Sequence, residues 1–337
     1  MRKAVLVLLL FVIACNGTVA GKEFSDEVSE IVERILNEDV KVNVQPGKLP
    51  SKAEIEQLNT YVNPVTKIVK ALKARGLDNK EIVEILKRYN LGWDPRTGAA
   101  WREFKKPSEK ELSYLKTLKP LSKNNNDVSI NQISGQANQV MEVIPDDIYR
   151  GINTNLKPSE MRLESDGTVQ HVITTHVGRT LVNESCWTEA GVVRWLVDGE
   201  PSDIWIFTFD NDEGQWKWHG TTNSSTFTNY IIYVTDQVDA WGYIYHIWIN
   251  EEWVRSGHLW YRENNVDQAN EVWTDTGSYT DDYGVAKHDD PFLYIQDYAV
   301  WWDDNVRTEW WHSPTNQCPV KEYHELEGSS WAYWTWI

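Results

Sequence analysis

Two glutamates stand on β-type segments whose same-face neighbours are tryptophans. In the stretch CWTEAGVVRW, the two-residue alternation of a strand places Glu189 on one face with Trp187 and Trp195. In the stretch QANEVWTD, it places Glu271 on one face with Trp273. A carboxyl beside indoles in a partly dry groove has a raised pKa, and two such groups close together titrate as a pair. One is then protonated while the other is charged, which is the general acid and general base that a hydrolase needs.

A structural interpretation of the same residues competes with the catalytic one. Each glutamate would then lie on a solvated sheet face, or pair with an arginine such as Arg194 or Arg255. On the pattern alone this interpretation is the simpler one, because ion-pair networks also perturb the pKa values of carboxyls.

Other common catalytic motifs are missing from the chain. The sequence has no HExxH zinc motif, no GxSxG nucleophile elbow and no glycine-rich phosphate loop. All eight histidines follow residue 170 and are scattered singly. The acidic turn Asp210–Glu213 is better interpreted as a plain solvated turn than as a calcium site. We therefore predict no metal and no cofactor.

The chain changes character near residue 127. Residues 21–126 show apolar residues at helical spacing and a net charge of about +4, whereas residues 127–337 carry a net charge of about −23. The polar stretch between Leu121 and Asp127 reads as an exposed linker. Beyond it, short segments rich in Trp, Tyr, Val, Ile and Thr alternate with turns, which is typical of an antiparallel two-sheet sandwich or jelly roll. The acidity argues against nucleic acid as a partner.

The N-terminus predicts export. Residues 1–20 combine a basic start with a short apolar run and a small-residue cleavage site, which is typical of a signal peptide. Alternatively, the residues before Cys15 resemble a lipobox, which would leave Cys15 lipidated and the protein anchored on the outer face of a membrane. No segment is apolar enough over sufficient length to predict a transmembrane span. In an exported chain, Cys186 and Cys318 are expected to form one disulfide.

The segment around Glu189 resembles a known protein family. The run CWTEAGV is similar to the first catalytic strand of neprosin-like glutamic peptidases, where a Glu-Ala-Gly carries one catalytic glutamate. The run ANEVW, with Glu271, resembles the second catalytic segment of that group and of the fungal-type glutamic peptidases (eqolisins). The resemblance implies an acid-active secreted endopeptidase on a concanavalin-like β-sandwich, made as a precursor. One glutamate would activate water and the other would protonate the scissile carbonyl oxygen, with no metal and no covalent intermediate.

The peptidase interpretation carries further expectations. The substrate would be a polypeptide, and the walls of its groove would include Trp187, Trp195, Trp248 and Trp273. The mildly basic residues 21–126 would be a helical pro-region that covers the acidic groove of the catalytic domain, residues 127–337, until a cut near Asn124–Asn126 releases it.

Two other functions fit the same residues. A glycoside hydrolase also pairs two carboxyls in a tryptophan-lined groove, and a retaining one needs them roughly 5–5.5 Å apart. A non-catalytic carbohydrate-binding module would instead leave Glu189 and Glu271 on different faces or far apart.

Overall fold

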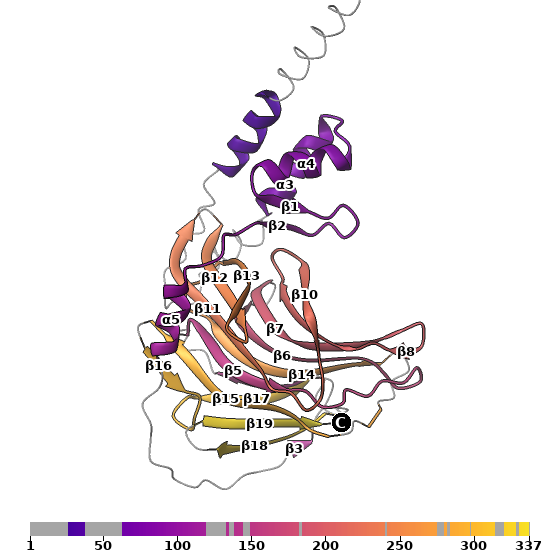
Figure 1. The fold of residues 1–337 in the computed structure, drawn as a ribbon, viewed down its shortest axis with the longest axis vertical. Helices are drawn as coiled ribbons and strands as arrows, with labels where there is room; N and C mark the ends of the chain where they lie inside the picture. Colours follow the sequence, from indigo (N-terminus) through magenta and orange to yellow (C-terminus); the bar gives the residue numbers. More distant parts are fainter. Residues whose placement is uncertain are drawn as a thin grey trace, which may run out of the picture. The chain divides into compact units, whose positions relative to one another are not determined.

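The computed structural model describes most of the chain from residue 26 onward. The described residues are 26–37, 63–118, 133–134, 138–143, 149–181, 184–239, 241–274, 280–281, 284–296, 298–313, 320–327 and 330–336. They fall into two compact units that divide between Glu103 and Phe104 (Figure 1).

The first unit is small and mainly helical, as the spacing of its apolar residues predicts. It contains a helix over residues 26–36, α3 (Pro64–Ala74), α4 (Asn79–Arg88) and a two-stranded hairpin of β1 (Leu91–Trp93) and β2 (Ala100–Arg102). The start of α4 is defined by a capping box, in which Asp78 and Glu81 each accept a backbone N–H from the other at 2.9 Å. One face of α4 buries Ile82, Ile85 and Leu86.

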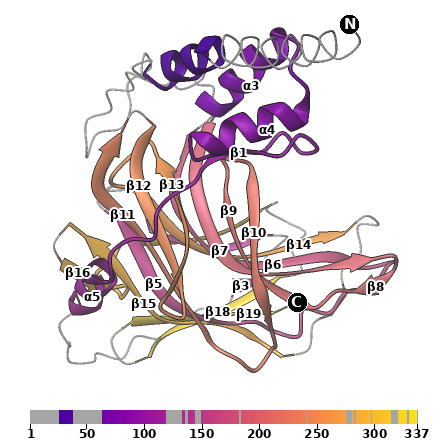
Figure 2. The same cartoon turned by 45° about the horizontal axis from the view of Figure 1, so that its top comes forward.

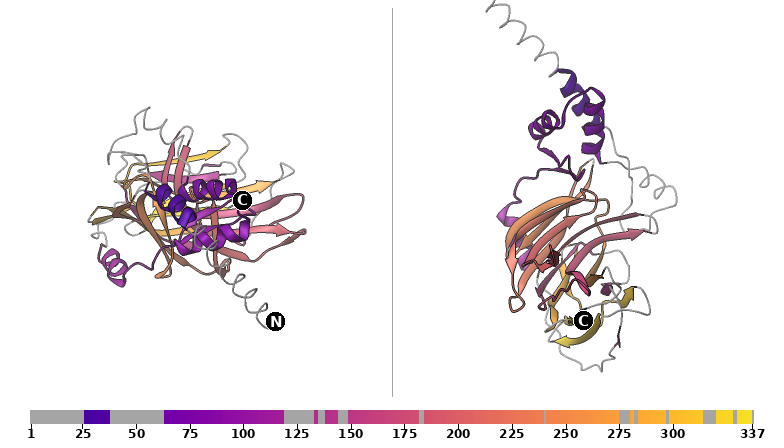
Figure 3. Two further views of the ribbon diagram at one scale, coloured as in Figure 1. Left: turned by 90° about the horizontal axis from the view of Figure 1, so that it is seen from above. Right: turned by 90° about the vertical axis from the view of Figure 1, so that its right-hand side faces the viewer.

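The second unit is a sandwich of two large antiparallel sheets (Figure 1 and Figure 3). Within the described residues, the eight-stranded sheet has the order β10-β9-β7-β6-β14-β4-β17, with β8 paired to β7. Its strands are β4 (Asn138–Val143), β6 (Thr168–Leu181), β7 (Glu184–Val197), β8 (Glu200–Pro201), β9 (Ile204–Asp210), β10 (Gln215–Thr222), β14 (Asn265–Thr274) and β17 (Thr308–Ser313). The predicted fold class, a mainly β antiparallel sandwich preceded by helices, is confirmed.

The nine-stranded sheet forms the second layer. Its order among the described residues is β13-β12-β11-β5-β15-β19-β18-β3, with β16 paired to β15. Its strands are β3 (Ile133–Ser134), β5 (Gly151–Lys157), β11 (Thr228–Asp239), β12 (Gly242–Ile249), β13 (Glu252–Leu259), β15 (Ala286–Ile295), β16 (Tyr298–Trp301), β18 (Lys321–Glu327) and β19 (Ser330–Trp336).

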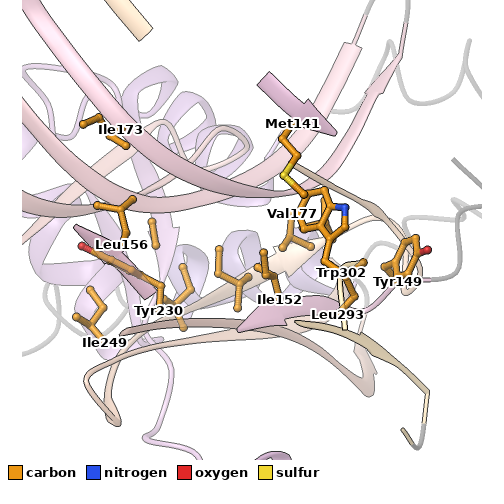
Figure 4. Packing of buried hydrophobic residues seen from close by; sticks show 14 of the residues in the cluster. Met141, Tyr149, Ile152, Leu156, Ile173, Val177, Tyr230, Ile249, Leu293 and Trp302 are labelled. Atoms are coloured by element: carbon orange, nitrogen blue, oxygen red, sulfur yellow. The ribbon is translucent and has the colours of Figure 1, made fainter. Parts of the chain in front are cut away.

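The hydrophobic core lies between the two sheets. Figure 4 shows Ile173 and Val177 of β6 facing Ile152 and Leu156 of the other sheet, and all four are fully buried. Because neighbouring side chains of a strand point to opposite faces, the residues between Ile173 and Val177 alternate between the core and the outer face. The outer face of the eight-stranded sheet is therefore the one that carries His176.

A short helix covers the outer face of the nine-stranded sheet. Leu115 of α5 (Glu109–Thr117) is fully buried in a cluster with Ile231, Tyr233 and Trp248. An ion pair between Lys116 and Glu251, 2.6 Å long, flanks this contact. The helical region predicted from the sequence is thus divided, because its last described helix packs as part of the β-sandwich unit.

The acidic turn between β9 and β10 is not a plain solvated turn, which corrects that prediction. Asp210 and Glu213 are almost fully buried. Tyr245 donates a 2.5 Å hydrogen bond to Asp210, and Arg255 donates a 2.6 Å bond to Glu213. The two carboxyls enter the protein because a phenol and a guanidinium from the other sheet satisfy them.

Several predictions concern residues outside the described ones and stay predictions. These are the signal peptide of residues 1–20, Cys15, the linker and cut site near Asn124–Asn126, and Cys318. Cys186 is described and lies buried in the core between the sheets. No helix among the described residues is both long and apolar enough to cross a membrane.

Candidate active site

A cleft of about 360 Å³ opens on the outer face of the eight-stranded sheet. The residues that line it come from β10, β9, β7, β6, β14 and β4, which are paired in this order, and Figure 2 labels β10, β9, β7, β6 and β14 of this layer. Glu189 and Glu271 both line this cleft, together with Trp187 and Trp273. The two glutamates identified from the sequence therefore share one face and one cleft, although 82 residues of chain separate them.

The register of three strands places a row of ionisable groups across the cleft. Glu189 on β7 is paired with His176 on β6, and His176 is paired with Asp267 on β14. Directly paired side chains on one face of a sheet lie within contact distance. The row consequently alternates carboxylate, imidazole and carboxylate.

Glu189 is held firmly at one of its two oxygens. The Thr174 hydroxyl lies 3.2 Å from Glu189 Oε2 and 3.1 Å from the Ala190 carbonyl oxygen, which share its one proton, and His176 Nε2 lies 2.7 Å from Glu189 Oε2. The side chain of Glu189 is only 6% exposed. Because both contacts use Oε2, Oε1 is the oxygen that remains for a water or a substrate.

His176 bridges the two carboxylates. Its Nε2 contacts Glu189, and its Nδ1 makes a short contact with Asp267 Oδ1. Burial opposes the charged imidazolium, but the carboxylates of Asp267 and Glu189 outweigh burial and hold the pKa of His176 well above its ordinary value. We therefore describe His176 as a cation, with both ring nitrogens donating.

Two glycines allow this packing. A Cβ on Gly191, two residues after Glu189, would lie 2.2 Å from the Ile173 carbonyl oxygen and 2.6 Å from Thr174 Cα. A Cβ on Gly178 would lie 2.3 Å from the Cβ of Trp187. The glycine of the Glu-Ala-Gly motif is thus required where β7 passes closest to the threonine that holds Glu189.

Glu271 lies farther along the cleft and in a different environment. It is paired with Val172 and stands four residues from Asp267 on the same face of β14. It is half-buried, and burial raises its pKa to about 7. This value of about 7 already includes the His176 cation, which lowers the pKa, and the charges of Glu189 and Asp267, which raise it. Glu271 is therefore protonated at acidic pH.

The predicted groove tryptophans separate into three groups. Trp187 and Trp273 line the cleft, and the ring of Trp187 meets that of His176 edge to face at 5.3 Å. Trp195 lines a second, adjoining cleft. Trp248 is not a groove residue, which corrects that prediction: it lies on β12 of the other sheet and is buried beneath Leu115 of α5.

His176, Thr174 and Asp267 were not identified from the sequence. Asp267 was detectable, because it shares the two-residue alternation of Glu271 on β14. His176 and Thr174 were not, since their role depends on β6 lying between β7 and β14.

No metal site accompanies these residues in the described part of the chain. No group of three or more His, Cys, Asp or Glu side chains there could hold a metal ion. Both nitrogens of His176 are engaged by carboxylates.

Comparison with known proteins finds similarity in structure only. No family model matches the chain, and no curated protein matches its sequence. A scytalido-glutamic peptidase bound to a peptide-based transition-state analogue aligns with 61% of this chain and all of its own, at 9% identity and a TM-score of 0.42. SCP-B, a member of the eqolisin family of peptidases, aligns over the same shares at 10% identity and a TM-score of 0.39.

Polysaccharide-acting proteins also show similarity. The alginate lyase Aly36B, in complex with an alginate trisaccharide, aligns with 49% of this chain and 73% of its own, at 12% identity and a TM-score of 0.28. These identities and TM-scores are too low to transfer an activity to this chain. Its function has to follow from the residues in the cleft.

Proposed function

We propose that this protein is a hydrolase of peptide bonds, a glutamic-type endopeptidase in which Glu189 and Glu271 act as a pair. The observation that carries the proposal is that the two glutamates line one cleft in unlike environments. Glu189 is held by Thr174 and His176, whereas Glu271 has a pKa raised to about 7 by burial. Environments that separate two carboxyls in this way define an acid and a base.

The spacing of the pair suits a substrate that lies between them. The register separates the Cα atoms of Glu189 and Glu271 by two interstrand spacings, about 10 Å, and by four residues along the strand, about 13 Å. Both side chains lie on the same face of the sheet and line the same cleft. The gap between them leaves room for a water and a peptide unit.

Each proton transfer in the hydrolysis can then be assigned to one of the two glutamates. Glu189 accepts a proton from the attacking water at Oε1, and the water oxygen bonds to the scissile carbonyl carbon. Protonated Glu271 donates to the carbonyl oxygen and stabilises the tetrahedral intermediate. When the C–N bond breaks, the proton held by Glu189 passes to the leaving amine, and the intermediate returns its hydroxyl proton to Glu271. His176 and Asp267 touch no reacting atom and act as positioning residues for Glu189.

The test compares two glutamine variants with a matched control. We expect Glu189→Gln and Glu271→Gln each to abolish cleavage of a denatured protein at pH 4 to 5, while circular dichroism stays unchanged. Glu252→Gln, at an exposed glutamate on β13 of the other sheet, should cleave like the wild type. Wild-type kcat/KM should fall as pH rises through about 7, because Glu271 loses its proton. Full activity in either site variant would remove that residue from the mechanism.

The proposal includes export and synthesis as a precursor. The support is the sequence of residues 1–20, the basic character of residues 21–126 and the polar linker that follows them. Mass spectrometry of the protein recovered from the culture medium and from the membrane fraction of an expressing host tests secretion, anchoring and removal of the pro-region. A start at residue 21 supports secretion, a lipidated Cys15 supports an anchor, and a start near residue 127 supports removal of the pro-region. An intact, fully active chain would contradict the precursor.

A glycoside hydrolase is the second candidate, favoured by the exposed tryptophans near the cleft. A retaining glycosidase needs its two carboxyls roughly 5–5.5 Å apart. The offset of two strands and four residues between Glu189 and Glu271 fits this spacing poorly. Release of reducing sugar from a glucan or xylan, lost in both glutamine variants, would favour the glycosidase over the peptidase.

A further inference from the structure

A second cleft of about 660 Å³ adjoins the candidate active site. Its walls include Trp195, Trp216 and Trp218. Trp216 and Gln170 line both clefts, so the two form one continuous surface. Trp216 is 39% exposed and Trp218 48% exposed. Large aromatic surface that stays exposed and contiguous in a soluble protein marks a place where a ligand binds.

The tryptophan rings in this cleft form an interlocked cluster. Trp216 and Trp218 stack at 5.7 Å with an angle of 14° between their planes. Trp195 packs on Trp218 at 5.3 Å and 42°. Their partners fix the rings in place, so that a ligand does not have to order them on binding.

The aromatic cleft lies within a short peptide's reach of Glu189. Trp216 on β10 is paired with Phe209 on β9, and Phe209 is paired with Glu189 on β7. Two interstrand spacings separate Trp216 from Glu189, about 10 Å, which is the length of about three extended residues. A polypeptide whose scissile bond lies at Glu189 would place a nearby side chain among the tryptophans.

We propose that this aromatic cleft is a substrate subsite that binds an aromatic or large aliphatic side chain within about three residues of the cleaved bond. The inference rests on the proposed peptidase function and names its substrate class. The residues that line the cleft include no charged side chain, and their polar side-chain groups are those of Ser165 and Gln170 and the indole N–H groups of the tryptophans. Sugar recognition needs several polar groups for the hydroxyls, whereas a hydrocarbon ring needs apolar walls. The lining therefore favours a side chain over a saccharide.

Specificity measurements test the subsite. The substrates are peptides that differ at one position, carrying Phe, Leu, Ala or Asp, with that position moved from one to four residues on either side of the cleaved bond. At one position we expect wild-type kcat/KM to be about tenfold higher for Phe than for Ala. In Trp218→Ala this ratio should fall below about threefold. Tyr298→Ala, at an exposed aromatic on β16 of the other sheet, should keep the wild-type ratio.

A binding measurement separates the subsite from the chemistry. In calorimetric titrations, Glu189→Gln should bind the Phe peptide about tenfold more tightly than the Ala peptide, and the added Trp218→Ala change should remove most of that difference. If the wild type cleaves no peptide but this binding difference is present, the peptidase fails and the subsite stands. If cleavage occurs with no preference at any position, the subsite is overturned and the peptidase stands. Binding of xylohexaose or cellohexaose that Trp218→Ala abolishes would also overturn the side-chain subsite.

Discussion

The raised pKa of Glu271 predicts how the free energy of unfolding depends on pH, and this can be measured without a substrate. The pKa of this carboxyl is raised from 4.5 to about 7 by burial and by neighbouring carboxylates. In the unfolded chain its pKa returns to the ordinary value near 4.5. The difference corresponds to about 3 kcal/mol in the free energy of unfolding.

Whether the free energy of unfolding rises or falls with pH depends on which state, folded or unfolded, holds the proton. Below pH 4.5 both states are protonated, so the contribution of Glu271 to stability is complete. Between pH 4.5 and about 7 only the folded state holds the proton, and the free energy of unfolding falls as pH rises. Glu271→Gln does not titrate. The stability of this variant relative to the wild type should therefore rise by about 3 kcal/mol between pH 4 and pH 8.

Urea unfolding followed by tryptophan fluorescence measures this difference. The signal reports mainly the β-sandwich, because 17 of the 19 tryptophans follow residue 180. Contributions from titrating groups far from Glu271 cancel between variant and wild type, and Glu252→Gln, on the other sheet, serves as the matched control. A constant difference between Glu271→Gln and wild type from pH 4 to pH 8 would mean that folding does not raise the pKa of Glu271, so that Glu271 loses its proton near its ordinary pKa of 4.5. The acid role of Glu271 would then be refuted.

Three further predictions concern packing. Gly191→Ala should lower stability by about 1–3 kcal/mol and reduce cleavage, since the added Cβ displaces Thr174; unchanged urea midpoint and activity would contradict this. Arg255→Met should cost about 3–5 kcal/mol in urea unfolding, because it leaves the buried Glu213 without its partner; a neutral result would mean that Glu213 is protonated in the fold. Leu115→Ala should cost about 2–5 kcal/mol and speed proteolysis within α5, and equal proteolysis rates would show that α5 contributes little.

The order of helical and β-rich regions could be predicted from the sequence. Apolar spacing and caps define α3 and α4, because these signals act within a few residues of each other. The faces of Glu189 and Glu271 were predictable for the same reason, since side-chain alternation along a strand is a local property of the backbone. The aromatic and β-branched composition likewise indicated a sandwich.

The pairing of strands was decided by the tertiary structure alone. Trp187 and Trp248 both lie on strands, yet one tryptophan lines the cleft and the other lies beneath a helix on the opposite sheet. His176 becomes the partner of Glu189 only because β6 runs between β7 and β14. Such contacts join residues far apart in the chain, and their energies depend on which surfaces meet during folding. The two glutamates could be identified from local residue patterns, whereas the order of the strands brings them into one cleft.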